Sequence, residues 1–583
     1  MPDGRTAGPA GAQRRIIERP RLGAEAALAN AVSQRMAQIY SARGIESVDE
    51  LDLTLGSLLL PTQLDGAARA AQLLADAVMA GRHIRFVGDF DADGATSSVV
   101  GVAALTAMGA ARVTFIVPNR FEFGYGLTPE IVAIAMADRP DVIITVDNGI
   151  SSIEGVRAAR AAGATVIITD HHLPGRELPA ADAIVNPNLP GCGFASPNLA
   201  GVGVIFYVLT LVRAQLRERG WFAKIGLDAP NMADYLDLVA LGTVADVVPL
   251  DRNNRILVEQ GLRRIRAGKA RPGIRALCEG SGRAMATLSA SDLAFALGPR
   301  LNAAGRLDDM SIGIRCLLAD NLVEARSLAT ALEGLNESRR VIQQQMTQEA
   351  ELAVVGVDLE GESRLGLCLY REGWHQGVVG IVAGKLKDRF GRPSIAFADA
   401  GPTAPDELRG SARSIPGVHI RDALDAIATR YPGLIQRFGG HAMAAGLSIR
   451  RVHLARFADA FATEVGRWVT ADEIGGVVLS DGELSATELE LSLADEIALA
   501  GPWGQGFPEP MFHGDFEIIH QRVVGERHLK LSLRKGSRVV DAIAFNQAPL
   551  RGASRIRIVY RLSRNDYRDR VTLQLVVEYI EPA

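Results

Sequence analysis

IRFVGDFDADG, residues 84–94, joins a short apolar run to three alternating aspartates, Asp89, Asp91 and Asp93, and then to a glycine. Carboxylates this close repel one another unless a divalent cation neutralises them, so the spacing predicts a site for Mg²⁺ or Mn²⁺. A calcium loop of the EF-hand type opens in the same way, but it needs a preceding helix and a Glu at its twelfth position, which here is Val100. Because we expect a strand before Asp89, we set calcium aside.

Two further apolar runs end in polar motifs. Residues 142–146 lead into Asp147-Asn148-Gly149, and residues 165–169 lead into Asp170-His171-His172. A short apolar run followed by a helical stretch is typical of a buried parallel strand. Ligands of open parallel sheets collect at the carboxyl ends of the strands. We therefore expect all three acidic motifs at one edge of one sheet.

A fourth motif, GTVADVVP at residues 242–249, places Asp246 inside an apolar segment. An unpaired carboxylate there would be costly, and a cation would remove that cost. Taken singly, Asp147 or Asp246 could instead cap a helix, and the Asp-His-His triplet could be a loop with a satisfied histidine. Four coincident motifs favour a metal site.

Composition restricts the class of protein. The chain has 583 residues, 48% apolar and 22% charged, which excludes disorder and predicts several domains. It shows no apolar stretch long enough to span a membrane and no signal peptide at its start, so we expect a soluble, cytoplasmic protein without membrane association. The cysteines form no Cys-x-x-Cys pair, which favours reduced thiols. They are Cys192, Cys278, Cys316 and Cys368.

Charge is distributed unevenly along the chain. The net charge of −4 argues against a protein that binds nucleic acid through general basicity. Residues 511–583, however, hold 13 Lys and Arg against 8 Asp and Glu. A second basic run, residues 252–275, reads equally well as a solvated helix face. A local nucleic-acid surface is therefore expected near the C-terminus.

Five segments follow from the pattern of apolar residues. Residues 1–80 form an N-terminal extension with helices. Residues 81–320 alternate strand and helix, which predicts an α/β fold with a doubly wound parallel sheet. A long polar helix over residues 321–355 connects this part to a second α/β unit, residues 356–475, and residues 476–583 are β-rich. The strands expected in the first sheet are residues 84–88, 112–118, 141–147, 165–170 and 183–186.

The β-rich end is expected to contain five strands with basic turns and a few aromatic residues between them. This combination suits a small barrel of the oligonucleotide-binding (OB) type. The periodicity alone equally permits a generic β-sandwich. The expected strands are residues 516–519, 529–533, 539–545, 555–560 and 571–579.

Glycine-rich segments carry the candidate phosphate contacts. Residues 374–380 lie between a strand and a helix, so their backbone amides face a natural anion site. Glycines elsewhere allow close backbone approach to hydroxyl, guanidinium and imidazole groups. The alternatives are ordinary turns with a core histidine or, at residues 298–306, an interdomain ion pair. The candidates are Arg300, Asn302, Arg306, His375, Ser411, Arg413 and His441.

The four acidic motifs resemble those of the DHH phosphoesterase superfamily, which is named after the Asp170-His171-His172 triplet. Within it, residues 298–306, 374–380 and 438–441 are similar to the RecJ family of bacterial single-strand-specific exonucleases. The resemblance runs from about residue 80 to the C-terminus, with no departure in the metal motifs. It implies a DHH catalytic domain, a DHHA1-like domain and an OB-like nucleic-acid-binding domain for the three folded parts.

The resemblance implies a 5′→3′ exonuclease specific for single-stranded DNA, which acts in DNA repair and recombination. Such enzymes release 5′-mononucleotides with Mn²⁺ or Mg²⁺ in a two-metal site, and Asp147 would be the bridging carboxylate. His172 would face the scissile phosphate, Asp170 would orient a neighbouring histidine, and the seven phosphate candidates would hold the DNA. The implied metal ligands are Asp89, Asp91, Asp93, Asp147, His171 and Asp246.

Other functions share parts of this pattern. A phosphodiesterase of short oligonucleotides or cyclic dinucleotides, or a pyrophosphatase, would have the same metal motifs, but a small substrate needs no basic β-domain. A DNA-binding scaffold with a dead site would be expected to lack metal ligands, which are all present. Beyond single-stranded DNA, the resemblance implies single-stranded DNA-binding protein and a RecQ-type helicase as partners.

Overall fold

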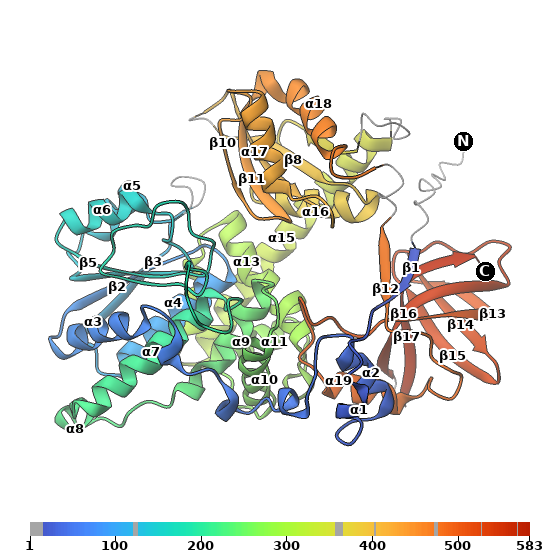
Figure 1. Cartoon of the computed structure of the whole chain (residues 1–583), viewed down its shortest axis with the longest axis horizontal. Helices are drawn as coiled ribbons and strands as arrows, with labels where there is room; N and C mark the ends of the chain where they lie inside the picture. Colours follow the sequence, from blue (N-terminus) through green and yellow to red (C-terminus); the bar gives the residue numbers. More distant parts are fainter. Residues whose placement is uncertain are drawn as a thin grey trace. The chain divides into compact units, whose positions relative to one another are not determined.

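The computed structural model describes residues 15–119, 126–355, 365–401, 404–470, 476–525, 527–567 and 570–582. The first 14 residues of the predicted N-terminal extension, and the predicted boundaries at 356 and 475, lie outside these ranges. The chain divides into two compact units, one made of Arg19–Asn336 with Asp481–Ala583 and the other of Met1–Glu18 with Glu337–Ser480 (Figure 1). We call them the larger and the smaller unit.

A parallel sheet of five strands lies in the larger unit. Its strands β2 and β4 are buried along their whole length, as their apolar runs predict. The predicted strands agree with the observed ones to within two residues at either end, which confirms the parallel sheet. In spatial order the strands are β3 (Arg112–Ile116), β2 (His83–Gly88), β4 (Val142–Val146), β5 (Thr165–Thr169) and β6 (Ala183–Val185).

Helices cover both faces of this sheet (Figure 1). Neighbouring side chains along a strand point to opposite faces, so Phe86 belongs to one apolar core and Val87 to the other. The predicted doubly wound arrangement is thereby confirmed. The first core contains α3 (Ala67–Met79), α4 (Ala92–Ala107) and α7 (Gly201–Glu218), and the second contains α5 (Pro129–Ala135) and α6 (Ile153–Ala161).

A group of helices follows the sheet in the same unit. The helix α9 is strongly apolar and is buried from Leu236 to Val244, whereas its last residue and Asp246 after it are half-buried. The helices are α8 (Trp221–Ile225), α9 (Leu236–Ala245), α10 (Arg252–Arg266), α11 (Pro272–Gly280), α12 (Ala290–Asp292), the π-helix η6 (Leu293–Leu297), α13 (Gly298–Leu307) and α14 (Ser311–Leu318).

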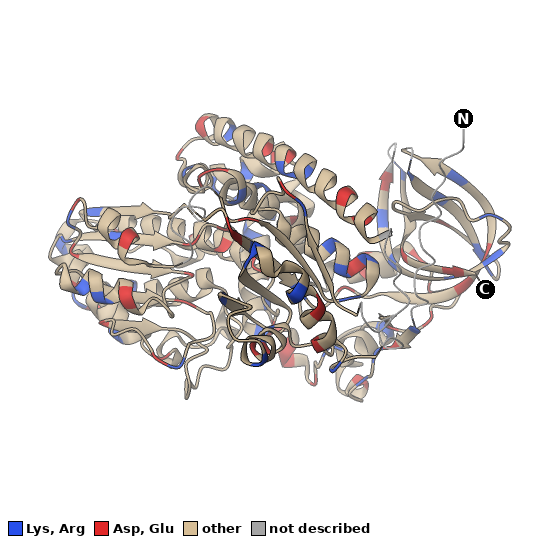
Figure 2. Ribbon diagram, turned by 90° about the horizontal axis from the view of Figure 1, so that it is seen from above, with Lys and Arg blue, Asp and Glu red and all other residues tan. Residues whose placement is uncertain are grey.

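The long helix α15 (Leu322–Val355) is present where residues 321–355 predict it. Acidic and basic residues are interspersed along it (Figure 2). Within the described residues, no helix is long and apolar enough to cross a membrane.

The smaller unit contains a mixed sheet. In this sheet β7 and β8 are parallel and the other neighbours are antiparallel, so the predicted strand and helix alternation produces a different topology from the first sheet. In spatial order the strands are β10 (Arg437–Gly440), β11 (Ala444–Arg450), β9 (Glu407–Arg413), β8 (Ser394–Asp399) and β7 (Leu367–Tyr370), with helices α16 (Val379–Phe390), α17 (Ile420–Arg430) and α18 (Leu454–Val465).

The C-terminal strands close into a five-stranded barrel, which confirms the barrel and excludes the β-sandwich. Four of these strands are longer than predicted, and the last two pair beyond their apolar residues as far as Tyr567 and Arg570. The barrel order is β13 (Phe512–Val524), β14 (His528–Lys535), β15 (Arg538–Ala544), β17 (Arg570–Pro582) and β16 (Arg555–Tyr567), and α19 (Leu491–Leu499) precedes it.

The N-terminal segment, which carries no recognisable motif, connects the sheet to the barrel. After α1 (Glu25–Leu28) and α2 (Gln34–Ser41), the Arg43 guanidinium donates two hydrogen bonds, of 2.7 and 3.0 Å, to the buried Asp481 carboxylate. The Tyr40 hydroxyl donates to the carbonyl of Ala500 at 2.9 Å. One apolar core therefore extends from the parallel sheet through these helices to the barrel. A separate strand, β1 (Arg15–Glu18), pairs with β12 (Val477–Ser480) in the smaller unit.

Candidate functional site

Three of the predicted acidic motifs lie at the carboxyl edge of the parallel sheet. Asp89 follows β2, Asp147 follows β4 and Asp170 follows β5. These strands are neighbours in the sheet, so their ends meet at one edge, where α/β proteins bind ligands. Asp147 has φ +61°, a backbone conformation that is uncommon for a residue other than glycine.

Asp91 caps the helix that follows. One oxygen of its carboxylate accepts the amide hydrogens of Asp93 and Gly94, each at 3.0 Å. A helix-capping role and a place in the acidic cluster therefore coexist in one residue. A Cβ on Gly94 would lie 2.5 Å from the carbonyl oxygen of Asp89, so only glycine fits this turn.

Asp93 is buried beneath the cluster and faces a helix N-terminus. Its two oxygens accept the amide hydrogens of Gly201 at 2.6 Å and Val202 at 3.0 Å, at the start of α7. Such amides stabilise a negative charge. Even so, burial, and then the charge of Asp91, raises the pKa of Asp93 to about 7. The site therefore holds more negative charge than the protein itself compensates.

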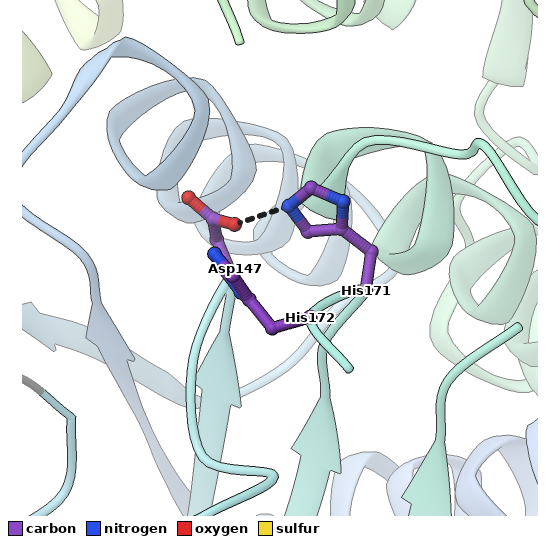
Figure 3. A group of neighbouring side chains, drawn as sticks. All are labelled: Asp147, His171 and His172. Carbon is purple, nitrogen blue, oxygen red and sulfur yellow. Dashed lines mark ion pairs between the residues drawn. The ribbon is translucent and has the colours of Figure 1, made fainter. Parts of the chain in front are cut away.

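His171 faces three carboxylates with one ring nitrogen. Its Nε2 lies 3.1 Å from Asp147 Oδ1, 3.4 Å from Asp246 Oδ2 and 4.0 Å from Asp93 Oδ2. Figure 3 shows the imidazole directed at Asp147. These partners come from the end of β4, the end of α9 and the start of α4, so His171 joins three separate elements.

The cluster fits a divalent cation by its chemistry. Burial, and then repulsion from neighbouring aspartates, raises the pKa of Asp147 and of Asp246 well above the ordinary value. A bound cation would favour the ionised carboxylates, and carboxylates together with imidazole suit Mn²⁺. Three overlapping triplets have donor atoms within 4.8 Å of one another: Asp147, His171 and His172; Asp93, His171 and Asp246; and Asp89, Asp91 and Asp147.

Asp170 is directed toward the protein backbone and His172. One oxygen accepts the amide hydrogen of Ile150 at 2.9 Å. The other accepts the amides of His171 and His172 at 2.7 and 3.0 Å and lies 2.7 Å from His172 Nδ1. Burial opposes the charge on both side chains, but their hydrogen bond and attraction outweigh it. The pKa of Asp170 is lowered, and that of His172 is raised to about 9.

Two asparagines near this site have no counterpart in the sequence prediction. Asn186 and Asn188 donate to the backbone carbonyls of His172 and His171 at 2.8 and 2.6 Å. They lie just after β6. The polar residues at the end of this fourth parallel strand could have indicated from the sequence that they belong to the site.

Glycines allow the helices to approach the cluster. A Cβ on Gly201 would lie 2.7 Å from the Asp147 Cβ, and one on Gly242 would lie 2.9 Å from Asp93 Oδ1 and 2.2 Å from Thr96 Oγ1. The helices α7 and α9 thus depend on these glycines to reach the carboxylates.

Gly242→Ala is expected to lower the free energy of unfolding by about 1–3 kcal/mol, because the added methyl overpacks a buried contact. Gly280→Ala is the matched control, since a Cβ there meets nothing within 4 Å. Thermal unfolding of both variants checks this, and equal midpoints would contradict it.

The predicted phosphate contacts in the larger unit have other partners. Arg300 is buried, pairs with Glu333 on α15 and donates to the carbonyl of Ala296. The Asn302 side chain accepts the amide hydrogen of Ala92, at the start of α4, at 2.8 Å. Both residues hold α13 in place beside the acidic motif. The partly buried Arg306 lies in the last turn of α13.

The remaining candidates lie in the smaller unit. Ser411 and Arg413 are alternate residues of β9, and Arg413 donates to Ser411 Oγ at 3.1 Å. A Cβ on Gly380, in the first turn of α16, would lie 3.0 Å from the Arg413 guanidinium. His375 precedes α16 and accepts the amide hydrogen of Gly377 at 3.0 Å. His441 is exposed in the turn after β10.

Three family models match successive parts of the chain. The DHH family N-terminal domain matches residues 83–243, the DHHA1 domain matches residues 363–470, and the RecJ OB domain matches residues 480–579. Their order follows the parallel sheet, the mixed sheet and the barrel.

Relatives match nearly the whole chain. The single-stranded-DNA-specific exonuclease RecJ of Dickeya dadantii is 52% identical over 571 residues, which are 97% of this chain and 99% of the relative. The protein of the same name from Escherichia coli is 50% identical and covers 94% and 95%. The crystal structure of RecJ in complex with Mn²⁺ from Thermus thermophilus has a TM-score of 0.80 at 30% identity, over 97% of this chain and 79% of that one. A complex with Mg²⁺ has a TM-score of 0.74 at 29% identity.

Proposed function

The chain belongs to the RecJ family of single-stranded-DNA-specific exonucleases, and on that premise we propose that it degrades single-stranded DNA from the 5′ end and releases 5′-mononucleotides. The enzyme is a metal-dependent nuclease, and its acidic and histidine cluster fits Mn²⁺ or Mg²⁺. That cluster, at the carboxyl edge of the parallel sheet, is the observation that carries the proposal.

We propose a two-metal site held by six residues. Asp147 groups with Asp89 and Asp91, and its carboxylate also lies 3.1 Å from His171 Nε2, which supports it as the bridging carboxylate. When bound, a pair of divalent cations would polarise the phosphate and lower the pKa of a coordinated water molecule to near neutrality. The ligands would be Asp89, Asp91, Asp93, Asp147, His171 and Asp246.

His172 would act on the phosphate and Asp170 would orient His172, so neither residue would hold metal. The oxygens of Asp170 already accept N–H groups and the His172 ring, so this carboxylate orients His172. We infer that His172 keeps a proton at neutral pH and donates from its other ring nitrogen to a phosphate oxygen. This places a positive charge beside the scissile bond.

Ser411 and Arg413 are the strongest candidates for holding the DNA backbone. Within the described residues Arg413 forms no ion pair, and burial lowers its pKa, so its surroundings lack negative charge. Phosphate would supply that charge. His375, His441 and Arg306 remain proposed contacts. For Arg300 and Asn302 we instead propose that they position α13, because their polar groups bind protein atoms.

We further propose a division of labour between parts of the chain. Residues 81–320 would carry out catalysis, and residues 356–475 would form a DHHA1-like domain that holds the DNA backbone. Residues 476–583 would bind the strand through the barrel, by charge and base stacking. A nuclease for single strands depends on a helicase to expose them, so a RecQ-type helicase and single-stranded DNA-binding protein are the partners we expect in DNA repair and recombination. That role places the enzyme in the cytoplasm with the chromosome.

The proposal is tested with single-stranded DNA labelled separately at its 5′ and 3′ ends, incubated with Mn²⁺. We expect immediate release of labelled mononucleotide from the 5′ end only. Release from the 3′ end would overturn the direction. Activity restricted to fragments of two to five nucleotides would indicate the short-oligonucleotide phosphodiesterase instead.

Arg413→Ala in the same assay is expected to raise KM about tenfold, because a charged hydrogen bond contributes roughly 1.5–3 kcal/mol. Arg467→Ala is the matched control, since Arg467 already pairs with Glu464 at 3.0 Å. If the two variants behave alike, Arg413 does not hold the strand.

A further inference from the structure

The chain leaves the acidic and histidine cluster through an unusual backbone turn after Asp246. Asp246 ends α9, with its amide donating to Gly242 O at 2.9 Å. The next residue, Val247, has φ +63° and is 61% exposed. A β-branched residue in this conformation costs about 1–3 kcal/mol and persists only where the surroundings hold it. Contacts beyond Val247 must therefore hold the turn that follows Asp246.

Those contacts come from the segment that leads into the barrel. Leu250, which is buried, donates its amide hydrogen to Gln505 O at 2.7 Å. A Cβ on Gly504 would lie 2.7 Å from Leu250 Cδ1. Gly506 has φ +71°, and a Cβ there would lie 3.2 Å from Pro249 Cβ. The backbone of residues 504–506 thus lies directly against Pro249 and Leu250, with little room for a Cβ on Gly504 or Gly506.

Phe507 anchors this contact. It is 3% exposed, and the Arg255 guanidinium of α10 lies 4.4 Å from its ring centroid. Arg255 is 4% exposed and forms no ion pair in the part of the chain that the structure describes, so the ring face is a principal partner of its charge. Trp503 stacks on Phe507 at 5.1 Å, and Tyr40 lies at 6.3 Å.

We propose that residues 503–507 are a positioning element for Asp246. The hydrogen bond to Leu250 and the packing of Gly506 on Pro249 fix the chain four residues beyond Asp246, and Phe507 fixes α10 beyond that. Residues 503–507 thereby set the position of the Asp246 carboxylate, independently of any contact of the barrel with DNA. This inference rests on the proposed role of Asp246 as a metal ligand.

The test measures Mn²⁺ binding by the full-length protein from the electron paramagnetic resonance signal of free Mn²⁺, without DNA. Gly506→Ala is expected to weaken Mn²⁺ binding about tenfold, at the lower end of what loss of a ligand's support costs. Binding of single-stranded DNA in EDTA should be unchanged. Gly536→Ala is the matched control: Gly536 also has a positive φ, +58°, and a Cβ there would approach only Ala486, at 3.6 Å. Equal losses in both variants would overturn the inference.

Asp246→Asn separates this inference from the proposed function. If Asp246→Asn leaves Mn²⁺ binding intact, the ligand assignment itself is wrong. If Asp246→Asn weakens binding and Gly506→Ala does not, only the positioning role is wrong. The double variant should bind Mn²⁺ as weakly as Asp246→Asn alone, because both changes act through one ligand. Additive losses would also overturn the inference.

Discussion

Asp147→Asn is expected to reduce nuclease activity by a factor of about 10³ or more, because metal stabilisation of the transition state is worth several kcal/mol and each 1.36 kcal/mol is tenfold in rate. Asn keeps the shape of the side chain but removes the charge of the carboxylate that groups with Asp89 and Asp91 and lies 3.1 Å from His171. The measurement is the rate of mononucleotide release at saturating Mn²⁺. Asp141→Asn is the matched control, because Asp141 directly precedes the same strand at its opposite end and accepts the His83 amide at 2.8 Å.

Stability distinguishes a lost ligand from a damaged fold. In EDTA the Asp147→Asn protein should be at least as stable as the wild type, because one of several repelling buried carboxylates is gone. The folded-state pKa of Asp147 lies well above its ordinary value of 3.8, so the folded protein binds more protons than the unfolded chain. Stability of the metal-free wild type therefore falls as pH rises above about 4, and the variant should lose less. A variant that unfolds at lower temperature throughout would contradict this.

The local part of the fold and site could be predicted because it is encoded in short segments. An apolar run followed by Asp89, Asp147 or Asp170 specifies a buried strand and the sheet edge at which it ends. The sequence likewise predicts the long polar helix α15, because a long stretch without proline can be identified as helical without knowledge of tertiary contacts. The closing of the barrel follows from five successive strands, although the alternation alone could not exclude a sandwich.

Pairings between distant residues could not be predicted in this way. Arg300 lies near glycines in the sequence, a pattern that also suits a phosphate contact. In the structure it forms an ion pair with Glu333 on another helix. Tyr40 and Trp503 stack at 6.2 Å although most of the chain separates them. A contact between such distant residues leaves no local pattern in the N-terminal segment from which it could be predicted. The apolar segment around Asp246 drew attention to this residue, but only the structure shows the hydrogen bond from Leu250 to Gln505 four residues beyond it.

Charged residues also show the difference between what the sequence predicts and what only tertiary contacts reveal. The basic excess of residues 511–583 suggests a surface for nucleic acid, but ion pairs use part of it, such as Arg557 with Asp515 at 2.8 Å and Lys530 with Asp541 at 3.1 Å. Arg413, by contrast, sits in a segment with little excess charge. Its significance is that the guanidinium is half-buried and forms no ion pair within the described ranges, which no count of charged residues reveals.

Asp170→Asn is the second change with a large expected effect, a loss of about 10–100-fold in activity, which is the usual result of removing a carboxylate that orients a histidine. The amide cannot keep both the backbone hydrogen bonds and the ion pair to His172. The pKa of His172, held near 9 by the hydrogen bond and charge of Asp170 against the effect of burial, should fall. If the reaction needs protonated His172, activity declines as pH rises through that pKa, so the decline should begin at lower pH in the variant.

The measurement is kcat from pH 6 to 9.5 at saturating Mn²⁺, which separates this titration from metal binding. The variant should be closest to wild type at pH 6 and furthest from it near pH 8.5. His172→Gln has no ring to titrate and should abolish the alkaline decline, and adding Asp170→Asn to it should cost little more. Asp182→Asn, which removes a carboxylate that accepts the Val166 amide at 2.9 Å, is the matched control and should keep the wild-type profile. A uniform loss across the whole pH range would mean that Asp170 supports the His171 and His172 backbone alone, and that the proton on His172 plays no part in the reaction.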